Sequence, residues 1–151
     1  MLRGSCLCGS VRFEINGQVK EMSNCHCSQC RKAYGSAFGT IAVVAKDDFS
    51  YTTGQEFIAS FNATERVTRY HCRNCGSPLP IREDWDRLVG VPAGLLDDDP
   101  GTKPSSHIFV GSKAPWWVIT DALMQHESWP PGEDMNERAK ILKDRTPPSR
   151  T

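Results

Sequence analysis

Short stretches in which hydrophobic and polar residues alternate dominate this chain, and long helical patterns are rare. Val11, Phe13 and Ile15 alternate with charged residues, which is the two-residue period of a half-buried β-strand. The same reasoning predicts further strands at residues 40–45, 57–61, 66–70, 88–91, 107–110 and 116–119. Turn sequences such as Asn16-Gly17 and Thr53-Gly54 separate these segments. The pattern therefore predicts a mainly β protein.

Two segments are candidates for short helices. The first has Ser28 as its N-cap, continues over residues 29–34 and ends at Gly35. The second falls in residues 130–151, where a weak helical stripe runs between prolines. We expect one domain at residues 1–129, followed by an appended C-terminal tail that is partly helical.

Size and charge narrow the classes of function. A chain of 151 residues has the commonest size of a single domain. Its 18 basic and 18 acidic residues cancel, so no overall positive field attracts nucleic acid, and we expect no such partner. No apolar run reaches the roughly 18 residues of a membrane span, and the start MLRGSC does not resemble a signal peptide. These features predict a cytoplasmic location and no membrane partner, and they leave the oligomeric state open.

The seven cysteines change the picture more than any other composition feature. Disulfides do not persist in a reducing cytosol, so clustered thiols there usually bind metal or carry out redox chemistry. Zinc takes four protein ligands in a structural site, and three with one open position in a catalytic site. Seven cysteines can be divided as four and three. They occur in three groups, Cys6-x-Cys8, Cys25-x-Cys27-x-x-Cys30 and Cys72-x-x-Cys75.

The spacing of these groups favours one division. Cys72 and Cys75, followed by Gly76, have the pattern of a zinc knuckle, which needs a second pair of thiolates. The first two cysteines of the chain could supply that pair, because residues two apart on an extended segment point the same way. The three cysteines of the segment CHCSQC would then form a local cup whose fourth corner stays open to water or substrate.

Two other interpretations compete with this division. In the first, Cys27 and Cys30 pair with the Cys72 group in a zinc ribbon. That ribbon would have an unusually long gap and would leave three cysteines unused. In the second, the cysteines are buried or redox-sensing residues without metal, although six of the seven would then have ligand spacing by accident.

Histidine is a common zinc ligand, but each of the four histidines has a simpler interpretation. His26 alternates with two cysteines on an extended backbone and would point away from them, which favours an orienting or surface role. His71 flanks the knuckle, His107 opens an apolar segment as a core or rim histidine, and His126 suits an exposed position. We expect none of them to bind zinc.

Five separated segments together point to a family: GSCLCGSVRFEI, CHCSQCRKAYGSAF, YHCRNCGSPL, GLLDDDP and HIFVGSKAPWW. They closely resemble, in the same order, the glutathione-dependent formaldehyde-activating enzyme family, which includes the centromere protein V type. The resemblance covers residues 4–127. It implies an Mss4-like fold, a zinc-stabilised β-sandwich of small antiparallel sheets, to which the tail would add a short C-terminal helix.

The resemblance also implies two zinc ions per chain. It assigns a structural zinc to Cys6, Cys8, Cys72 and Cys75, and a catalytic zinc to Cys25, Cys27 and Cys30. The family's named activity is S-(hydroxymethyl)glutathione synthase, classified as a carbon–sulfur lyase, which joins formaldehyde to the thiol of glutathione. The segment 123–126, Leu-Met-Gln-His, departs from a Leu-Pro-Gln-aromatic pattern of the family, and this departure bears on substrate identity more than on zinc binding.

The sequence therefore predicts a zinc-dependent carbon–sulfur lyase that joins glutathione, or a similar thiol, to formaldehyde or a related small aldehyde. Arg31 and Lys32 follow the cup directly and could bind the carboxylates of glutathione, although a solvated basic pair is the ordinary interpretation. A glutathione carrier or a zinc-stabilised binding module without catalysis is the main alternative. Nucleic-acid or cytoskeletal association, by analogy with the centromere-protein branch, is a weaker one because the charges balance.

Overall fold

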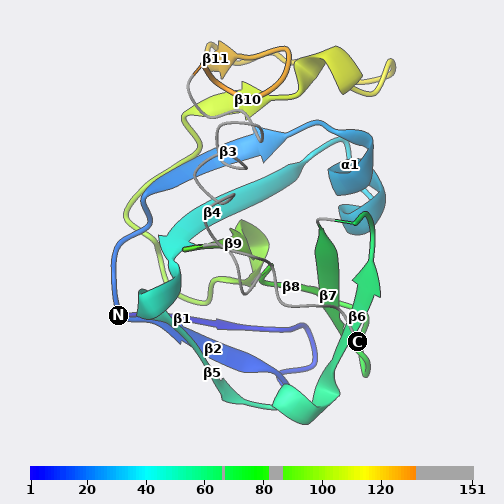
Figure 1. Cartoon of the computed structure of the whole chain (residues 1–151). Coiled ribbons are helices and arrows are strands. Elements are labelled where there is room, and N and C mark those ends of the chain that lie inside the picture. Colours follow the sequence, from blue (N-terminus) through cyan, green and yellow to red (C-terminus); the bar gives the residue numbers. More distant parts are fainter. Residues whose placement is uncertain (66, 82–86, 132–151) are drawn as a thin grey trace.

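Three small sheets and one α-helix make up the computed structural model, which describes residues 1–65, 67–81 and 87–131 (Figure 1). The first sheet has the order β1 (Leu2–Ser5), β2 (Arg12–Ile15), β5 (Phe49–Thr53). The central sheet has the order β11 (Met124–Gln125), β10 (Ser106–Ile108), β3 (Glu21–Cys25), β4 (Gly39–Ala45), β9 (Leu88–Pro92). The third has the order β6 (Ile58–Asn62), β7 (Thr68–Cys72), β8 (Pro78–Leu79). The expected mainly β class is confirmed.

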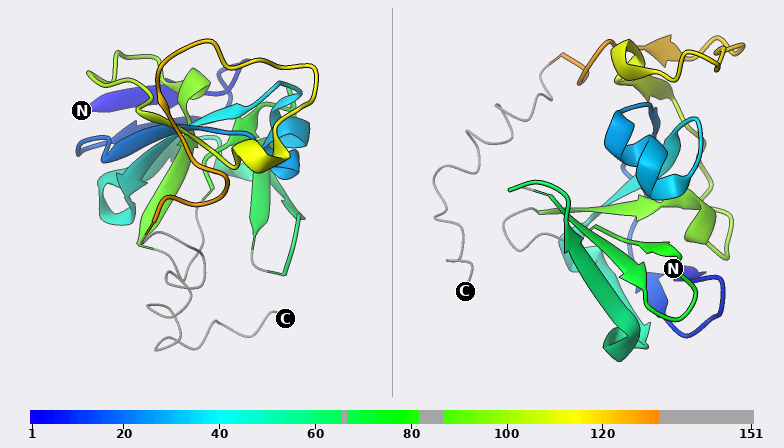
Figure 2. Two further views of the ribbon diagram at one scale, coloured as in Figure 1. Left: turned by 90° about the horizontal axis from the view of Figure 1, so that it is seen from above. Right: turned by 90° about the vertical axis from the view of Figure 1, so that its right-hand side faces the viewer.

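Most strand pairs are antiparallel, as predicted for small sheets. The exception is β10, which runs parallel to both β3 and β11. The helix α1 (Ser28–Tyr34) follows β3 and lies on the same side of the molecule as β6 and β7 in Figure 1, and Figure 2 shows the same elements from above and from that side. Four 3₁₀ turns complete the described elements, at Lys46–Asp48, Gln55–Phe57, Ala93–Leu95 and Val110–Ser112.

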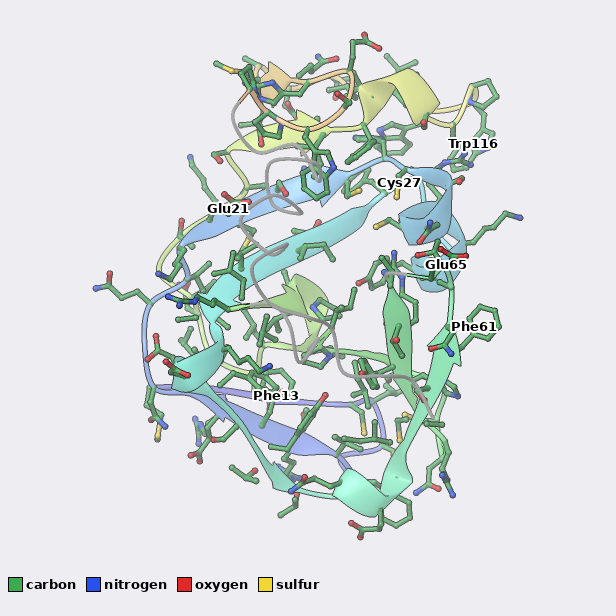
Figure 3. The ribbon with its side chains drawn as sticks, viewed as in Figure 1. Phe13, Glu21, Cys27, Phe61, Glu65 and Trp116 are labelled. Atoms are coloured by element: carbon green, nitrogen blue, oxygen red, sulfur yellow. The ribbon has the colours of Figure 1, made fainter. Side chains whose placement is uncertain are left out.

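The main core lies between the first sheet and the central sheet. Phe13 of β2 is almost fully buried there, and its ring packs 5.4 Å from that of Phe49 (Figure 3). Gly4 on the neighbouring strand β1 has a direct reason to lack a side chain, because the Phe13 ring occupies the space of a Cβ atom. The buried members of this core are Phe13, Ile15, Met22, Ala42, Val44, Phe49, Val89 and Val91.

The structure confirms most of the predicted strands and overturns one. The predictions for residues 40–45, 57–61, 66–70 and 88–91 match β4, β6, β7 and β9 to within about two residues at each end. The segment 107–110 begins as β10 and then leaves the sheet at Phe109, whose φ of 58° ends the extended backbone. The strand predicted at 116–119 is wrong, because Trp116, Trp117 and Val118 remain exposed and the backbone N–H of Trp117 donates to the Ala114 carbonyl in a turn.

The predicted helix is present, with its N-cap one residue earlier than expected. Cys27 is the N-cap, and its sulfur accepts the backbone N–H of Cys30 at 3.4 Å. Gly35 ends the helix in the left-handed conformation, as predicted. The tail helix and the division at residue 130 stay predictions, because residues 132–151 lie outside the described part of the chain. Among the described residues, no helix is long and apolar enough to cross a membrane.

Candidate metal centres

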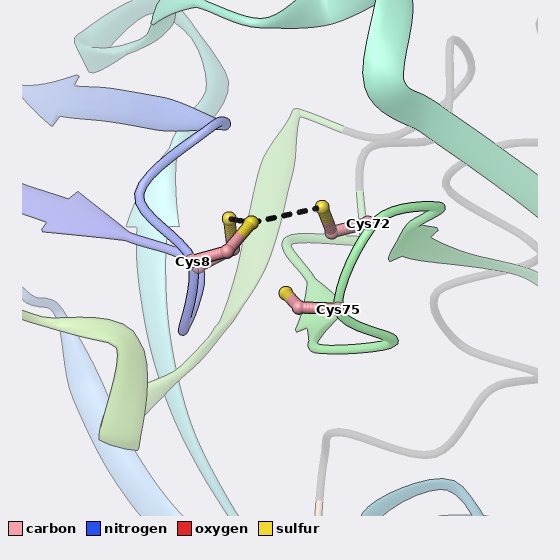
Figure 4. A group of neighbouring side chains, drawn as sticks. Cys8, Cys72 and Cys75 are labelled. Atoms are coloured by element: carbon pink, nitrogen blue, oxygen red, sulfur yellow. Dashed lines mark hydrogen bonds between the residues drawn. The ribbon is translucent and has the colours of Figure 1, made fainter.

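Four thiols meet where a turn of the first sheet faces a turn of the third (Figure 4). Cys6 and Cys8 come from the turn between β1 and β2, whereas Cys72 ends β7 and Cys75 lies in the turn between β7 and β8. All four sulfurs lie within 4.8 Å of one another. All four cysteines are free thiols. We refer to them as the four-cysteine cluster, which joins two hairpins that are far apart in the sequence.

The two turns use the same backbone device. Gly9 and Gly76 both adopt a positive φ, 73° and 76°, and each donates its N–H back to the carbonyl of the first cysteine of its turn. The Val11 N–H also donates to the Cys6 sulfur at 3.3 Å. Both turns therefore curl around their sulfurs, as expected for Gly76 from the knuckle pattern.

Hydroxyl groups accompany the two more exposed sulfurs of this cluster. The side chains of Cys8 and Cys75 each hydrogen-bond a serine hydroxyl two residues later, at 3.2 and 3.3 Å. The hydrogen bond to Ser77 lowers the pKa of Cys75 to about 5. Burial instead raises the pKa of Cys72 to about 11. A cation that binds thiolates would displace the remaining protons, so the donor set fits zinc.

The other three thiols form the cup predicted from the CHCSQC segment, defined by Cys25, Cys27 and Cys30. Cys25 ends β3, Cys27 caps α1 and Cys30 lies in the first turn of that helix, at the junction marked by Cys27 in Figure 3. Their sulfurs also lie within 4.8 Å of one another. Two of the three are buried and Cys27 is half-buried, so the cup is reached from its Cys27 side.

The three sulfurs of the cup compete for protons. Hydrogen bonds from the thiols of Cys25 and Cys30 lower the pKa of Cys27 to about 2. Hydrogen bonds to Cys27 and Cys30, together with burial, raise the pKa of Cys25. Within the described residues, no histidine, carboxylate or further cysteine joins these three as a fourth donor. The geometry thus fits a thiophilic cation with one position not supplied by these residues.

A buried chain of polar side chains supports the cup from behind. His26 is fully buried, so the surface role considered for it is wrong. Its Nε2 lies 2.8 Å from Nδ1 of His107, whose own Nε2 lies 3.0 Å from a carboxylate oxygen of Asp121. With Asp121 ionised and His107 neutral, His107 donates from Nε2, and its Nδ1 then accepts the Nε2–H of His26. Neither histidine belongs to one of the two cysteine groups.

Replacing His107 with leucine should lower the free energy of unfolding by about 1–3 kcal/mol, because the buried Nε2–H of His26 loses its acceptor. Guanidinium unfolding of the metal-saturated protein measures this change. His126→Leu is the matched control, since this half-buried histidine contributes its backbone N–H to the His107 carbonyl and leucine keeps that bond. Equal losses of unfolding free energy in His107→Leu and His126→Leu would contradict a stabilising role for the hydrogen bonds that link His26, His107 and Asp121.

The two basic residues predicted to bind substrate face different surroundings. Arg31 donates its Nε to the main-chain oxygen of His26 at 3.3 Å, whereas Lys32 lines a groove of about 450 Å³ beside α1. Arg69 of β7 lines the same groove, and its Nη2 donates to the Cys30 sulfur at 3.6 Å. Sequence reasoning missed Arg69, because nothing in its local pattern shows that β7 passes the cup.

Aromatic side chains pack against the buried histidines and against the cup. Phe38 packs 5.1 Å from the His26 ring and 5.8 Å from Trp117, which in turn contacts the exposed Trp116 (Figure 3). Phe109 packs against the cup with the only positive φ of a non-glycine residue in the described chain. Such a conformation costs about 1–3 kcal/mol and persists only where surrounding contacts hold it.

Comparison with known proteins identifies the family of this chain. The family model described as glutathione-dependent formaldehyde-activating enzyme matches residues 1–112. The chain belongs to this family. The resemblance of its five motifs is thereby confirmed.

Relatives from several organisms bear the name of the glutathione-dependent formaldehyde-activating enzyme. The chain is 30% identical to one from Halomonas elongata over 127 residues, which cover 79% of this chain and 81% of the relative. Identity is 34% to a Penicillium rubens protein and 31% to one from Podospora anserina, and both matches cover 71% of this chain. The matches span 59% and 53% of those two fungal proteins, so the chain corresponds to little more than half of their length.

A solved structure supports the fold. A crystal structure of a Rhodobacter sphaeroides protein superposes with a TM-score of 0.54 at 24% identity, covering 68% of this chain and 91% of that one. At this level of identity, the likeness concerns the fold alone.

Proposed function

We propose that this protein joins glutathione, or a similar thiol, to formaldehyde or a related small aldehyde, in the manner of a carbon–sulfur lyase. In this proposal Cys25, Cys27 and Cys30 hold a catalytic zinc, and the four-cysteine cluster holds a structural zinc. The observation that carries it is the contrast between the two groups. One has four sulfurs, enough for a closed site, and the other has three and no fourth donor among the described residues.

Zinc bound in the cup would supply Lewis acidity and favour a sulfur ligand in its thiolate form. The chain contributes the three sulfurs, the buried support of His26 and a half-open entrance at Cys27. In the overall reaction, the thiol sulfur forms a bond to the carbonyl carbon, and the proton lost from sulfur ends on the carbonyl oxygen. No oxidant or reductant is needed.

Basic residues beside the cup suit a substrate with two carboxylates. Lys32 is exposed in the groove next to α1, and a carboxylate there would meet its ammonium group. Arg31 uses Nε for the main chain of His26, which is one of five N–H groups on its guanidinium. We therefore keep both residues as substrate-binding candidates, with Lys32 better placed toward the groove.

The proposal predicts that zinc-loaded protein forms the hydroxymethyl adduct of glutathione faster than the uncatalysed reaction. NMR exchange rates of ¹³C-labelled formaldehyde with glutathione, with and without protein, measure this difference. A rate equal to the background together with stoichiometric glutathione binding would identify a carrier. A background rate without glutathione binding would leave a zinc-stabilised binding module. Salt-dependent binding to DNA would revive the nucleic-acid alternative.

A further inference from the structure

Residues of α1 and of the third sheet line the groove beside the cup, and Figure 1 shows where these elements lie in the fold. Gln29, Lys32 and Tyr34 line it from the helix, and Arg69 and Tyr70 line it from β7. Tyr34 also packs against the buried sulfurs of the cup. The groove and the cup therefore share a wall, and a ligand sulfur at the cup could extend the rest of its molecule along the groove.

Arg69 is the charged residue that connects the two spaces. Its Nη2 donates to the Cys30 sulfur at 3.6 Å, within the usual range for a sulfur acceptor, and its Nε is buried without a hydrogen-bond partner in the described part of the chain. Among the described residues that line the groove there is no carboxylate. The positive charge of Arg69 is thus directed at the cup and has no acidic partner in the groove.

The net charge of a cup that holds a divalent ion explains why a positive side chain beside it would matter. A divalent ion on three thiolates carries one net negative charge, and a fourth thiolate would raise it to two. In a half-buried site this accumulation of charge opposes binding, because Coulomb energies grow as the local dielectric falls. A guanidinium keeps its positive charge throughout the accessible pH range and so offsets the added charge.

We propose that Arg69 is the charge partner that lets the cup accept a fourth, anionic sulfur ligand. It is a specificity-determining residue that acts through Cys30 and favours a thiolate over neutral water at the open position. The inference rests on the proposed function, since it assumes that a thiol enters the metal shell. It adds that the preference for sulfur is set by a residue 39 positions away from Cys30 in the chain.

Cobalt-substituted full-length protein tests this inference without measuring activity. The thiolate-to-cobalt absorption of the cup is followed during titration with 2-mercaptoethanol, which has no carboxylate, and with glutathione. The spectrum of Cys27→Ser supplies the contribution of the four-cysteine cluster. For Arg69→Gln we expect about tenfold weaker binding of both thiols, as loss of a nearby charge in a half-buried site predicts. Arg69→Lys keeps the charge and should remain within about threefold of wild type.

Lys20→Met is the matched control, because it removes an exposed positive charge just before β3, at the end of the strand opposite Cys25. It should bind both thiols as wild type does. Equal thiol affinities for Arg69→Gln and wild type would overturn the inference. Weaker binding of glutathione alone would also overturn it and would make Arg69 a carboxylate anchor in the groove.

The failure of the proposed function gives a different result. If wild-type protein takes no thiol into the cobalt shell, both the proposed thiol chemistry and the role of Arg69 are excluded. If thiols bind but Arg69→Gln has no effect, the proposed function stands and Arg69 is a structural residue of β7. If Arg69→Gln does not fold, Arg69→Lys is the test. A folded Arg69→Lys protein that no longer binds thiols would contradict the charge argument, because lysine keeps the positive charge.

Discussion

Replacing Cys72 with serine should prevent the domain from folding stably. The Cys72 side chain is fully buried in a smaller hydrophobic cluster, which it forms with Cys6, Val11 and Leu79, and its sulfur lies 3.9 Å from that of Cys8. Structural zinc contributes about 10–16 kcal/mol of apparent binding energy in zinc-finger peptides. A whole domain is typically stable by only about 5–15 kcal/mol. Loss of one ligand should therefore consume most of the stability.

The measurement is thermal unfolding of purified protein together with its zinc content. Cys8→Ser separates the metal effect from packing, because Cys8 belongs to the same cluster but is exposed. The Cys8→Ser protein should lose the same ion and, when zinc is present, should be much less stable than wild type. After treatment with a chelator, Cys8→Ser and wild type should unfold alike, while Cys72→Ser remains less stable. A wild-type melting temperature that does not respond to chelation would contradict a metal in this cluster.

The cysteine pattern shows why some long-range features could be predicted from the sequence. The spacing of Cys72 and Cys75, with Gly76 after them, determines a tight turn with two convergent sulfurs, and such a turn requires a partner pair. Once one pair is matched, the remaining three thiols are already neighbours in the chain. Local geometry and a count of ligands therefore anticipated a contact between β1 and β7, which strand patterns alone do not reveal.

The alternation of hydrophobic and polar residues does not predict a strand that is buried on both faces. The strand β3 is buried along almost its whole length, so the alternation that identifies a half-exposed strand is absent from it. The segment 116–119 shows the opposite case, because its hydrophobic residues predict a strand whereas Trp116, Trp117 and Val118 are exposed.

The contacts that surround the cup could not be predicted from the sequence. His26 and His107 meet because β3 and β10 pair in parallel, and the Asp121 carboxylate reaches His107 from a loop further along the chain. No spacing rule links three residues whose contacts depend on which strands become neighbours. The same holds for Arg69, which reaches Cys30 from another sheet. The chemistry of the ligands is local in the chain, whereas the groups that adjust it are brought there by the fold.

Replacing Cys27 with serine should abolish adduct formation above the background rate while leaving the domain folded. The Cys27 side chain has two separable roles, as one of three sulfurs of the cup and as the N-cap of α1, where it accepts the Cys30 N–H. Serine is among the best N-cap residues, so the hydroxyl keeps the second role. A neutral serine hydroxyl is a poor ligand for zinc, so the first role is lost.

We therefore expect Cys27→Ser to contain one zinc ion where wild type contains two, and to change the free energy of unfolding by about 1 kcal/mol or less. Ser28→Ala is the matched control, because Ser28 is the exposed neighbour and its side chain is not a cup ligand. It should keep both ions and the full rate. Two zinc ions and an undiminished rate in Cys27→Ser would show that the cup is not the reactive site. Loss of folding in Cys27→Ser, with Ser28→Ala unaffected, would instead make the cup a second structural centre, because only a metal that holds the fold together would unfold the protein when the helix cap is preserved.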